Sequence, residues 1–255
     1  MKKRLKEILL DFQNSKITIN QVLEFLKEQE KIVEVEFASL DANREKRTAI
    51  PEIIFCENKS TDKILEIIKK LYSENKLVIG TRCSDDKLKV IKKKYPAGKY
   101  SFESNSFYIG KPKKKISGKV ALITAGTTDV PVLEEASIVL EALGINHEKF
   151  YDIGVAGIHR LFSKYEQINS CDVLIVAAGM EGALPSVIGG IFSQPIIAIP
   201  VSVGYGTALN GFTALFAMLT SCSPGITVVN INNGVGAASA AVKILRLIEN
   251  KSSKD

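Results

Sequence analysis

The stretch that decides the fold is residues 119–129, KVALITAGTTD, in which a short apolar run ends in a small polar turn containing glycine. Four further apolar runs in the same half of the chain are followed by glycine-bearing polar segments. Apolar runs of four to six residues that alternate with helical patterns are typical of βαβ units in a parallel sheet. We therefore predict strands at 119–124, 148–151, 173–177, 196–200 and 227–230.

The turns after these strands carry most of the chemically useful side chains. In parallel α/β sheets, ligands bind outside the carboxyl ends of the strands, and all five turns must lie at that edge. We therefore expect one site assembled from several turns. The five turn segments are 125–129, 152–160, 179–182, 201–206 and 232–234.

The chain has room for one large or two modest domains, because it contains 255 residues of which 45% are hydrophobic. The segment 111–118, KPKKKISG, combines charge with backbone breakers and is the best linker candidate. We predict a small basic α/β domain at 1–115 and a second domain at 116–255. Residues 1–117 carry 26 Lys and Arg against 17 Asp and Glu, so the basic character belongs to the first part.

Several function classes are excluded by composition. The apolar runs are far shorter than the roughly 20 residues of a membrane span, and the basic start leads into an amphipathic helix containing Glu7 and Asp11 instead of a signal peptide. The lysine clusters at 69–70 and 92–94 fit solvated helix faces better than a nucleic-acid surface. We expect a cytoplasmic protein with neither a membrane nor a nucleic-acid partner.

The remaining elements follow from local patterns. In the first domain we predict helices at 1–11 and 19–28, a helix opening at residue 60 or 61 and another after 84–86. Half-buried or buried strands are predicted at 33–37, 53–56 and 77–80. In the second domain a helix begins near Pro131, and a strongly apolar helix is predicted at 207–220.

The first turn of the second domain has the composition of an anion site. Gly126 lets backbone N–H groups approach a ligand, Thr127 and Thr128 offer hydroxyl donors, and Asp129 precedes a helix whose N-terminus favours negative charge. A phosphate would fit there. A short strand-to-helix turn without any ligand would have a similar sequence.

The next two turns hold ionisable groups. Asp152, His159 and Arg160 share one glycine-rich segment, and His159 is either a functional imidazole or an ordinary surface residue. Glu181 follows a very apolar strand within Gly179–Gly182, where desolvation would favour its protonated form and suit general acid or base chemistry. The alternative is an acidic residue that only favours a helix N-terminus.

Cys222 is the most distinctive single residue. It follows the predicted helix 207–220, whose dipole disfavours a thiolate, so a reactive role needs a base or cation from another turn. We interpret Cys56, Cys83 and Cys171 as small packing residues. None of the four cysteines has CxxC spacing, so neither a zinc site nor a disulfide framework is predicted. The loop 200–206 suits close approach over a flat ligand.

Five motifs in order carry a resemblance to a known family. The chain resembles the pyridinium-3,5-biscarboxylic acid mononucleotide synthases of nickel-pincer nucleotide cofactor biosynthesis, and Leu40-Asp41, Arg44, Arg47 and Pro51-Glu52 resemble their amino-terminal domain. The five motifs are TAGTTDVPV (124–132), DIGVAGIHRL (152–161), GMEGALPSV (179–187), PVSVGYG (200–206) and VVNINNG (228–234).

This resemblance implies a fold and an assembly. The second domain of the family is similar to aminoimidazole ribonucleotide carboxylases and mutases. We therefore expect a three-layer α/β domain with a parallel sheet, preceded by a smaller α/β domain. The resemblance also implies a homo-oligomer, an octamer.

The implied reaction takes nicotinic acid adenine dinucleotide and carbon dioxide or bicarbonate. The pyridinium ring is carboxylated at C5, and the phosphoanhydride is hydrolysed to release AMP. No tightly bound cofactor is implied; Mg²⁺ is the metal that the hydrolysis would use, and no ligands for it are identified.

The resemblance also implies residue roles. Cys222 would be the nucleophile and Glu181 an acid, base or positioning residue, with Asp152 and His159 as further catalytic residues. The implied substrate-binding residues are Gly126, Thr127, Thr128, Asp129, Arg160, Gly179, Met180, Gly204, Tyr205, Gly206, Asn232, Asn233 and Gly234.

Three positions depart from the family's pattern, and two other functions compete. Asn232 stands where the family has Asp, Val235 replaces an aromatic residue, and Ala49 replaces a glycine. A carboxylase or mutase of aminoimidazole ribonucleotide would need a histidine but no cysteine. A non-catalytic nucleotide-binding module would use the same turns without turnover.

Overall fold

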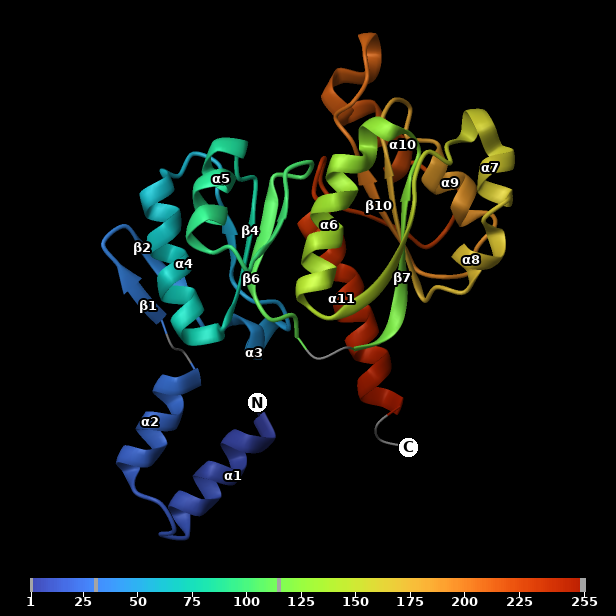
Figure 1. Cartoon of the computed structure of the whole chain (residues 1–255). Helices are drawn as coiled ribbons and strands as arrows, with labels where there is room; N and C mark the ends of the chain where they lie inside the picture. The colour runs from blue at the N-terminus through green and yellow to red at the C-terminus, as the bar shows by residue number, and fades with distance from the viewer. Residues whose placement is uncertain (1, 30–31, 114–115, 253–255) are drawn as a thin grey trace.

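Five parallel strands form the sheet of the second domain, in the order β11-β10-β9-β7-β8 (Figure 1). The computed structural model describes residues 2–29, 32–113 and 116–252. Two of the three inner strands, β9 and β10, are buried along their whole length, as expected for strands covered on both faces. The strands are β7 (Ile116–Thr124), β8 (Ile145–Phe150), β9 (Val173–Ala178), β10 (Ile196–Pro200) and β11 (Ile226–Val228).

All five predicted strands are present, and the starts of three are shifted: the inner strand β7 begins three residues before its predicted start, and both edge strands differ as well. β8 begins three residues before the predicted start, and β11 covers 226–228 instead of 227–230. Both are edge strands with one neighbour each. Edge strands carry polar residues, so their apolar pattern is broken and their ends are harder to locate.

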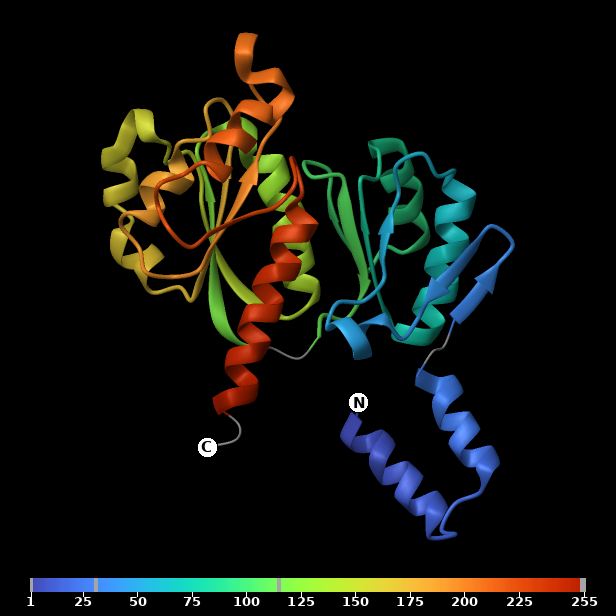
Figure 2. The same ribbon diagram turned by 180° about the vertical axis from the view of Figure 1, so that it is seen from behind.

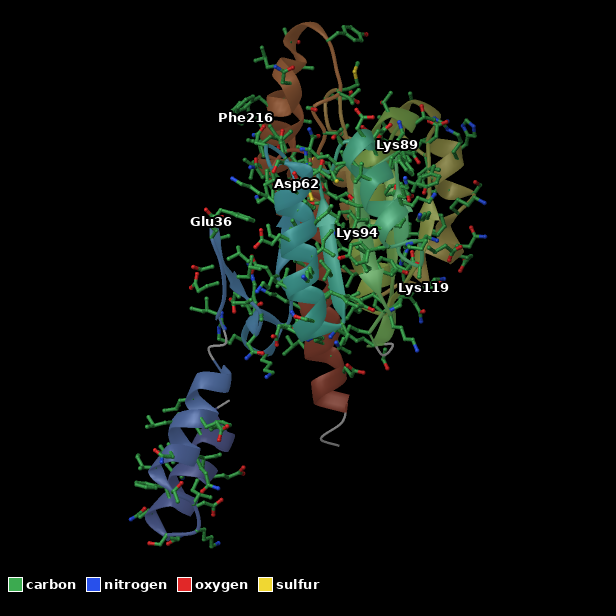
Figure 3. All side chains as sticks on the ribbon, turned by 60° about the vertical axis from the view of Figure 1, so that its left-hand side comes forward. Glu36, Asp62, Lys89, Lys94, Lys119 and Phe216 are labelled. Atoms are coloured by element: carbon green, nitrogen blue, oxygen red, sulfur yellow. The ribbon has the colours of Figure 1, made fainter. Side chains whose placement is uncertain are left out.

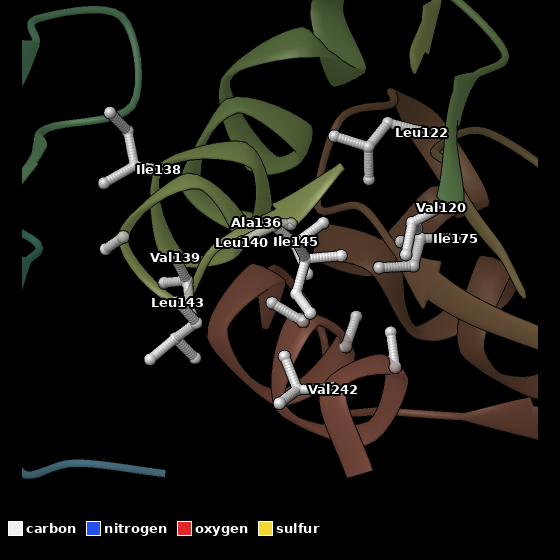
Figure 4. Packing of buried hydrophobic residues seen from close by; sticks show 14 of the residues in the cluster. Val120, Leu122, Ala136, Ile138, Val139, Leu140, Leu143, Ile145, Ile175 and Val242 are labelled. Carbon is white, nitrogen blue, oxygen red and sulfur yellow. The ribbon is translucent and has the colours of Figure 1, made fainter. Parts of the chain in front are cut away.

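Helices cover both faces of this sheet and complete three layers. One face packs against α6 (Val130–Ala142) and α11 (Gly234–Ser252). Figure 4 shows Val139 and Val242 of these helices in the buried cluster that also contains Val120 and Ile175 of the sheet. The other face packs against the remaining four helices. These are α7 (Ile158–Phe162), α8 (Tyr165–Asn169), α9 (Leu184–Gly189) and α10 (Phe212–Leu219).

The first domain has a mixed sheet of four strands, in the order β3-β4-β6-β5. Its helices α4 (Thr61–Asn75) and α5 (Asp85–Lys94) pack on one face, and the Ser60 hydroxyl accepts the Lys63 N–H at the start of α4. The strands are β3 (Ile53–Phe55), β4 (Leu77–Thr81), β5 (Lys99–Ser101) and β6 (Ser106–Gly110). The predicted linker joins the two domains; Lys114 and Lys115 within it, at the predicted boundary 115/116, lie outside the described residues.

Helix α6 joins the two domains. Leu77, Ile79 and Tyr108 of the first sheet belong to the same buried cluster as the apolar residues of α6. In Figure 4, Ile138 lies on the side of α6 that is nearer the first domain. Because α6 is covered by one sheet on each side, the two domains share one core.

Three strands of the first domain, β2 (Ala38–Asp41), β5 and β6, were not predicted, and one predicted strand is wrong. The hairpin β5–β6 has no alternating pattern, because β6 is buried on both faces for most of its length. The predicted strand 33–37 is instead a hairpin of β1 (Ile32–Val35) and β2, with Glu36 and Phe37 in the turn. The short helix α3 (Arg44–Thr48) follows.

The predicted helix 207–220 is also corrected. A 3₁₀ segment, η3 (Gly206–Gly211), contains left-handed residues at Leu209 and Asn210, and α10 begins only at Phe212. Left-handed residues break the helical hydrogen-bond pattern, and apolar periodicity does not reveal them. On α10 only Ala214 and Met218 are buried. The rest of its own chain therefore covers only one side of this apolar helix.

The first two helices form a separate hairpin. Helices α1 (Lys2–Gln13) and α2 (Ile19–Gln29) match the predicted positions and lie apart from the second domain (Figures 1 and 2). In the ranges that the structure describes, no helix is long and apolar enough to cross a membrane.

Candidate active site

A cavity of about 280 Å³ opens at the carboxyl ends of three neighbouring strands, β8, β7 and β9. This is the edge at which the sequence predicts a site. The turns after these strands form most of its lining, and Val203 from the turn after β10 completes it. The lining residues are Ala125, Gly126, Thr128, Asp129, Asp152, Gly154, Val155, Ala156, Arg160, Ala178, Gly179, Met180, Glu181, Ala183, Leu184 and Val203.

Asp129 connects two of these turns. Its side chain is buried, with one carboxylate oxygen 2.8 Å from the Gly126 nitrogen and the other 3.1 Å from the Gly179 nitrogen. Burial raises the pKa of Asp129, and the two accepted N–H bonds act in the opposite direction. The Gly126 N–H therefore already has an acceptor, and a bound phosphate would rely on other donors of this turn. The exposed Thr127 and Thr128 are the nearest in sequence.

Two glycines allow close contact between the turns. A Cβ on Gly154 would lie 2.5 Å from the Ala125 carbonyl oxygen, and one on Gly179 would lie 2.6 Å from that of Val203. Heavy atoms cannot approach so closely, so these positions need glycine. Gly126 differs, because a Cβ there would meet nothing nearer than 3.8 Å.

The backbone is strained at two cavity residues. Asp152 and Met180 have φ angles of 54° and 52°, in the left-handed region that costs energy for residues with a side chain. The Asp152 N–H donates to the Thr124 hydroxyl at 3.0 Å, and its carboxylate forms an ion pair with Arg160. Strained backbone of this kind clusters at functional sites.

Glu181 and His159 are both exposed. Glu181 lines the cavity, so the desolvation expected after a buried strand is not present in the single chain. His159, on α7, is outside the cavity lining, whereas Arg160 beside it is part of that lining. The structure therefore brings Asp152, Arg160 and Glu181 together in the cavity lining, and the His159 imidazole is not part of that lining.

Cys222 also lies outside the cavity lining, in the loop between α10 and β11. It is exposed, whereas the other three cysteines are buried as predicted. Its loop is held on α9, because Ser221 and Ser223 contact the Ser186 hydroxyl and carbonyl, each at 2.7 Å. The thiol is thus accessible and attached to the helix that begins in the cavity wall.

The segment Asn232-Asn233-Gly234 makes structural contacts. The Asn232 side-chain oxygen accepts the Ser202 N–H at 2.9 Å, and its NH₂ group donates to the Ser202 hydroxyl at 2.7 Å. An ionised Asp at this position would have no donor for the second of these bonds. Asn233 accepts the Gly236 N–H at 2.7 Å within the first turn of α11. A Cβ on Gly234 would lie 2.5 Å from the Val132 carbonyl oxygen, so glycine permits α11 to pack on α6.

The loop after β10 extends away from the cavity. Tyr205 is 81% exposed and stands between Gly204 and Gly206, both of which have positive φ. None of these three residues lines the cavity. A role over a flat ligand stays a prediction for this loop.

The sequence analysis missed an ion pair between the domains. Glu135 on α6 is buried and accepts the Arg82 Nε–H at 3.1 Å and the Val235 N–H at 3.2 Å. Burial raises the pKa of Glu135, an effect that the Arg82 guanidinium opposes. Arg82 also donates to the Asn232 carbonyl. The sequence did contain a signal for this ion pair, because Glu135 stands within a mostly apolar helix. A carboxylate is buried only when it is paired, so a cation from elsewhere in the chain could have been expected.

Comparison with known families covers most of the chain. Residues 32–111 match a family described as the LarB/PurE-like N-terminal domain, and residues 119–255 match AIR carboxylase. The chain belongs to the AIR carboxylase family. The two domains together have the architecture of the pyridinium-3,5-biscarboxylic acid mononucleotide synthases, which confirms the resemblance of the five motifs.

Individual relatives agree with this assignment. An uncharacterized protein of Methanocaldococcus jannaschii is 40% identical over 97% of this chain and 99% of its own length. An N5-carboxyaminoimidazole ribonucleotide mutase of Thermotoga maritima is 30% identical over 50% of this chain and 74% of its own length. A mutase of the same name from Methanocaldococcus jannaschii is 31% identical over 53% and 83%, respectively.

Proposed function

We propose that this protein carboxylates C5 of the pyridinium ring of nicotinic acid adenine dinucleotide and hydrolyses its phosphoanhydride. The products are pyridinium-3,5-biscarboxylic acid mononucleotide and AMP, and carbon dioxide or bicarbonate is the co-substrate. The observation that carries the proposal is the joint presence of both family domains in one chain, with three of the five motif turns, and Val203 of a fourth, around one cavity.

The chemistry calls for a nucleophile. A pyridinium ring is electron-poor, so C5 cannot attack carbon dioxide directly. In this proposal the thiolate of Cys222, which is exposed on the loop held against α9 and lies outside the cavity lining of the single chain, adds to a carbon next to C5. The addition turns the ring into an enamine with a nucleophilic C5. C5 then forms a bond to carbon dioxide, a base removes the C5 proton, and the C–S electron pair leaves with the sulfur. The ring is aromatic again and the cysteine is regenerated.

The cavity residues suit the other tasks. Glu181 lines the cavity and is exposed there, and in this proposal its carboxylate accepts the C5 proton. Arg160, held by Asp152, presents a guanidinium that binds carboxylate or phosphate. Thr127 and Thr128 lie just before α6, whose N-terminus favours a phosphate.

Hydrolysis completes the reaction. Water attacks one phosphorus of the phosphoanhydride, and the bond to the bridging oxygen breaks to release AMP. Among the described residues no group of three or more His, Cys, Asp and Glu side chains is positioned to hold a metal ion. A Mg²⁺ ion acting in this step would take most of its ligands from the substrate phosphates and water.

The second candidate is a mutase of N5-carboxyaminoimidazole ribonucleotide, which is the printed name of two relatives. These relatives match about half of this chain, so the first domain is outside what they share. A mutase would need neither Cys222 nor a dinucleotide. The first domain and the exposed cysteine favour the carboxylase.

Chromatography of reactions with each substrate tests the proposal. We expect release of AMP from nicotinic acid adenine dinucleotide only when bicarbonate is present, and no conversion of N5-carboxyaminoimidazole ribonucleotide. Conversion of the ribonucleotide by both wild type and Cys222→Ser would identify a mutase. Binding without any product from either compound would identify a nucleotide-binding module.

A further inference from the structure

A large cavity lies in the first domain, between the C-terminal ends of α4 and α5 and the carboxyl end of β6. Its volume is about 740 Å³, compared with about 280 Å³ for the candidate active site. Cavities of about 300–1,000 Å³ are the size that drug-sized ligands occupy. We call this space the basic cavity, because lysines surround it.

The basic cavity and the candidate active site lie at opposite ends of α6. Lys113, which lines the basic cavity, donates its N–H at 3.0 Å to the carbonyl of Ala142, the last residue of α6. The other end of α6 follows Asp129, which lines the candidate active site. A helix of 13 residues is about 20 Å long, so the two spaces are separate sites.

The wall of the basic cavity is mostly apolar. The buried side chains of Leu77 and Ile109 come from the neighbouring strands β4 and β6. Tyr72 and Tyr95 add aromatic rings from the ends of the two helices, and Pro96 follows. Apolar and aromatic walls of this kind favour a ligand with an apolar or aromatic body.

Four lysines from separate elements surround this wall. Gly110 brings two of these elements together, because it pairs with the start of β4 and has a φ of 108°. A Cβ at this position would lie 2.0 Å from the Lys76 carbonyl oxygen, so only glycine fits. The four lysines are Lys76, Lys94, Lys111 and Lys113.

The lining itself does not balance this positive charge. None of the described residues that line the basic cavity is Asp or Glu, whereas three carboxylates line the candidate active site. The cavity is therefore suited to an anion.

Two of the lysines already have partners. Lys113 forms an ion pair with Glu45 at 3.1 Å, and the Lys76 Nζ lies 5.9 Å from the ring centre of Tyr72. The other two have no ion pair with any residue that the structure describes. One of them stands at the end of α5, where a cation offsets the helix dipole, but the other follows β6, where no helix ends.

We propose that the basic cavity binds an organic anion with an aromatic or other apolar body and one acidic group, a carboxylate, phosphate or sulfonate. The body would lie against Leu77, Ile109 and the two tyrosine rings, and the acidic group would face Lys94 and Lys111. Burial of the body supplies affinity, and the lysines favour an acid over a neutral analogue. This site is additional to the substrate site and does not depend on the substrate that the candidate active site takes.

Calorimetry with 4-benzoylbenzoate, which has two aromatic rings and one carboxylate, tests this proposal. We expect the wild type to bind it with a dissociation constant below about 1 mM. The uncharged amide of the same compound should bind at least about fivefold more weakly, because it lacks the attraction to the lysines. Equal affinities for the acid and the amide would overturn the proposal, as would absence of binding at millimolar concentration.

Charge reversal locates the site. Lys94→Glu combined with Lys111→Glu should weaken binding of the acid by at least about tenfold and change that of the amide by less than about twofold. The matched control is Lys69→Glu combined with Lys93→Glu, at exposed lysines of α4 and α5 outside the lining. It changes the net charge equally and should bind the acid as the wild type does. Equal losses in the two variants would reject the basic cavity as the binding site.

Photolabelling of the wild type with the same benzophenone probe needs no variant. We expect labelled peptides that contain 72–77, 94–98 or 109–113, and labels found only elsewhere would contradict the proposal. Excess nicotinic acid adenine dinucleotide should leave this labelling unchanged, since the two sites are separate. The labelling is expected whether or not the protein carboxylates the dinucleotide, and its loss on addition of the dinucleotide would show one shared site instead.

Discussion

At the scale of single residues, Cys222 is where the covalent chemistry is most exposed to test. In Cys222→Ser the hydroxyl is a far weaker nucleophile near neutral pH and an alkoxide is a poorer leaving group. We expect carboxylation to fall by about three orders of magnitude or more. Dinucleotide binding, measured by calorimetry, should stay within about twofold of the wild type, because it depends on other turns.

The control for this variant is Cys171→Ser, at a buried thiol that contacts the Gln167 carbonyl at 3.6 Å. It should keep most of the activity in the same assay. A Cys222→Ser enzyme with a near wild-type rate would eliminate covalent catalysis by this residue. Base chemistry at Glu181 or His159 would then be the surviving route.

Asp129 is a second residue with a measurable role. Its carboxylate accepts two N–H bonds, whereas the NH₂ of an asparagine would face one of these donors. We expect Asp129→Asn to lower the free energy of unfolding by about 1–3 kcal/mol at neutral pH, measured in urea. At the exposed Asp172, which accepts one N–H from Lys119 at 2.7 Å, the same substitution should cost less than about 0.5 kcal/mol.

The pH dependence of stability gives Asp129 an independent signature. Burial raises the pKa of this carboxyl above its unfolded value, so the folded state binds more protons between the two values. The wild type should therefore lose stability as the pH rises from the ordinary carboxyl range through the raised value. Asp129→Asn should lack this part of the slope. Identical slopes for the two proteins would contradict the assignment.

At the scale of elements, the turn after β7 can be tested by contrasting two glycines. Gly126 has a φ of −131° and free space around its Cβ position, so Gly126→Val should fold. Its side chain would enter the cavity, and we expect at least about tenfold weaker dinucleotide binding in calorimetry. Gly154→Ala should instead lower the melting temperature, because its methyl group would collide with the Ala125 carbonyl.

Unchanged dinucleotide affinity of Gly126→Val would remove this turn from the binding site. A Gly154→Ala protein as stable as the wild type would show that the contact between the two turns is loose.

The elements show which features a sequence can reveal. Apolar runs separated by glycine-bearing turns predicted five parallel strands and the edge at which the cavity lies, because a strand buried on both faces is a continuous apolar run in the sequence. The left-handed pair Leu209-Asn210 leaves no such record, so the helix 207–220 was predicted too long. The strands β5 and β6 were missed because they are short and β6 lacks alternation.

The site was predictable in its turns but not in its contacts. The residues of the first three turns line the cavity largely as expected, because parallel topology brings these turns together. Asn232 and Gly234 follow a strand at the same edge but have structural roles. Asn232 accepts a hydrogen bond from Ser202 in the turn after β10, and Gly234 allows α11 to pack on α6. Arg82 and Glu135 meet across 53 positions of the chain, a pairing that no local pattern contains.

At the scale of the whole molecule, an exposed apolar surface indicates assembly. Leu209, Phe212, Phe216 and Leu219 are between 49% and 63% exposed, and Figure 3 shows Phe216 on the outer side of the second domain. Such a surface on a folded chain marks a contact with another protein, and a second copy is the partner that the octamer of the resemblance implies. We expect light scattering at micromolar concentration to give a multiple of 27.8 kDa.

Phe216→Lys should reduce the mass, because a lysine would have to be buried in the contact between copies. Phe162→Lys is the matched control, since Phe162 is 55% exposed on α7 and Phe216 is 58% exposed. The control should assemble as the wild type does. A monomeric wild type would refute the assembly.

The most direct test of the function is mass spectrometry of the products formed from nicotinic acid adenine dinucleotide and ¹³C-bicarbonate. The account predicts a mononucleotide that carries two ring carboxylates, one of them labelled, and one AMP for each molecule of it. Absence of labelled biscarboxylate, with the dinucleotide intact or cleaved to unlabelled mononucleotide and AMP, would contradict the proposed carboxylation.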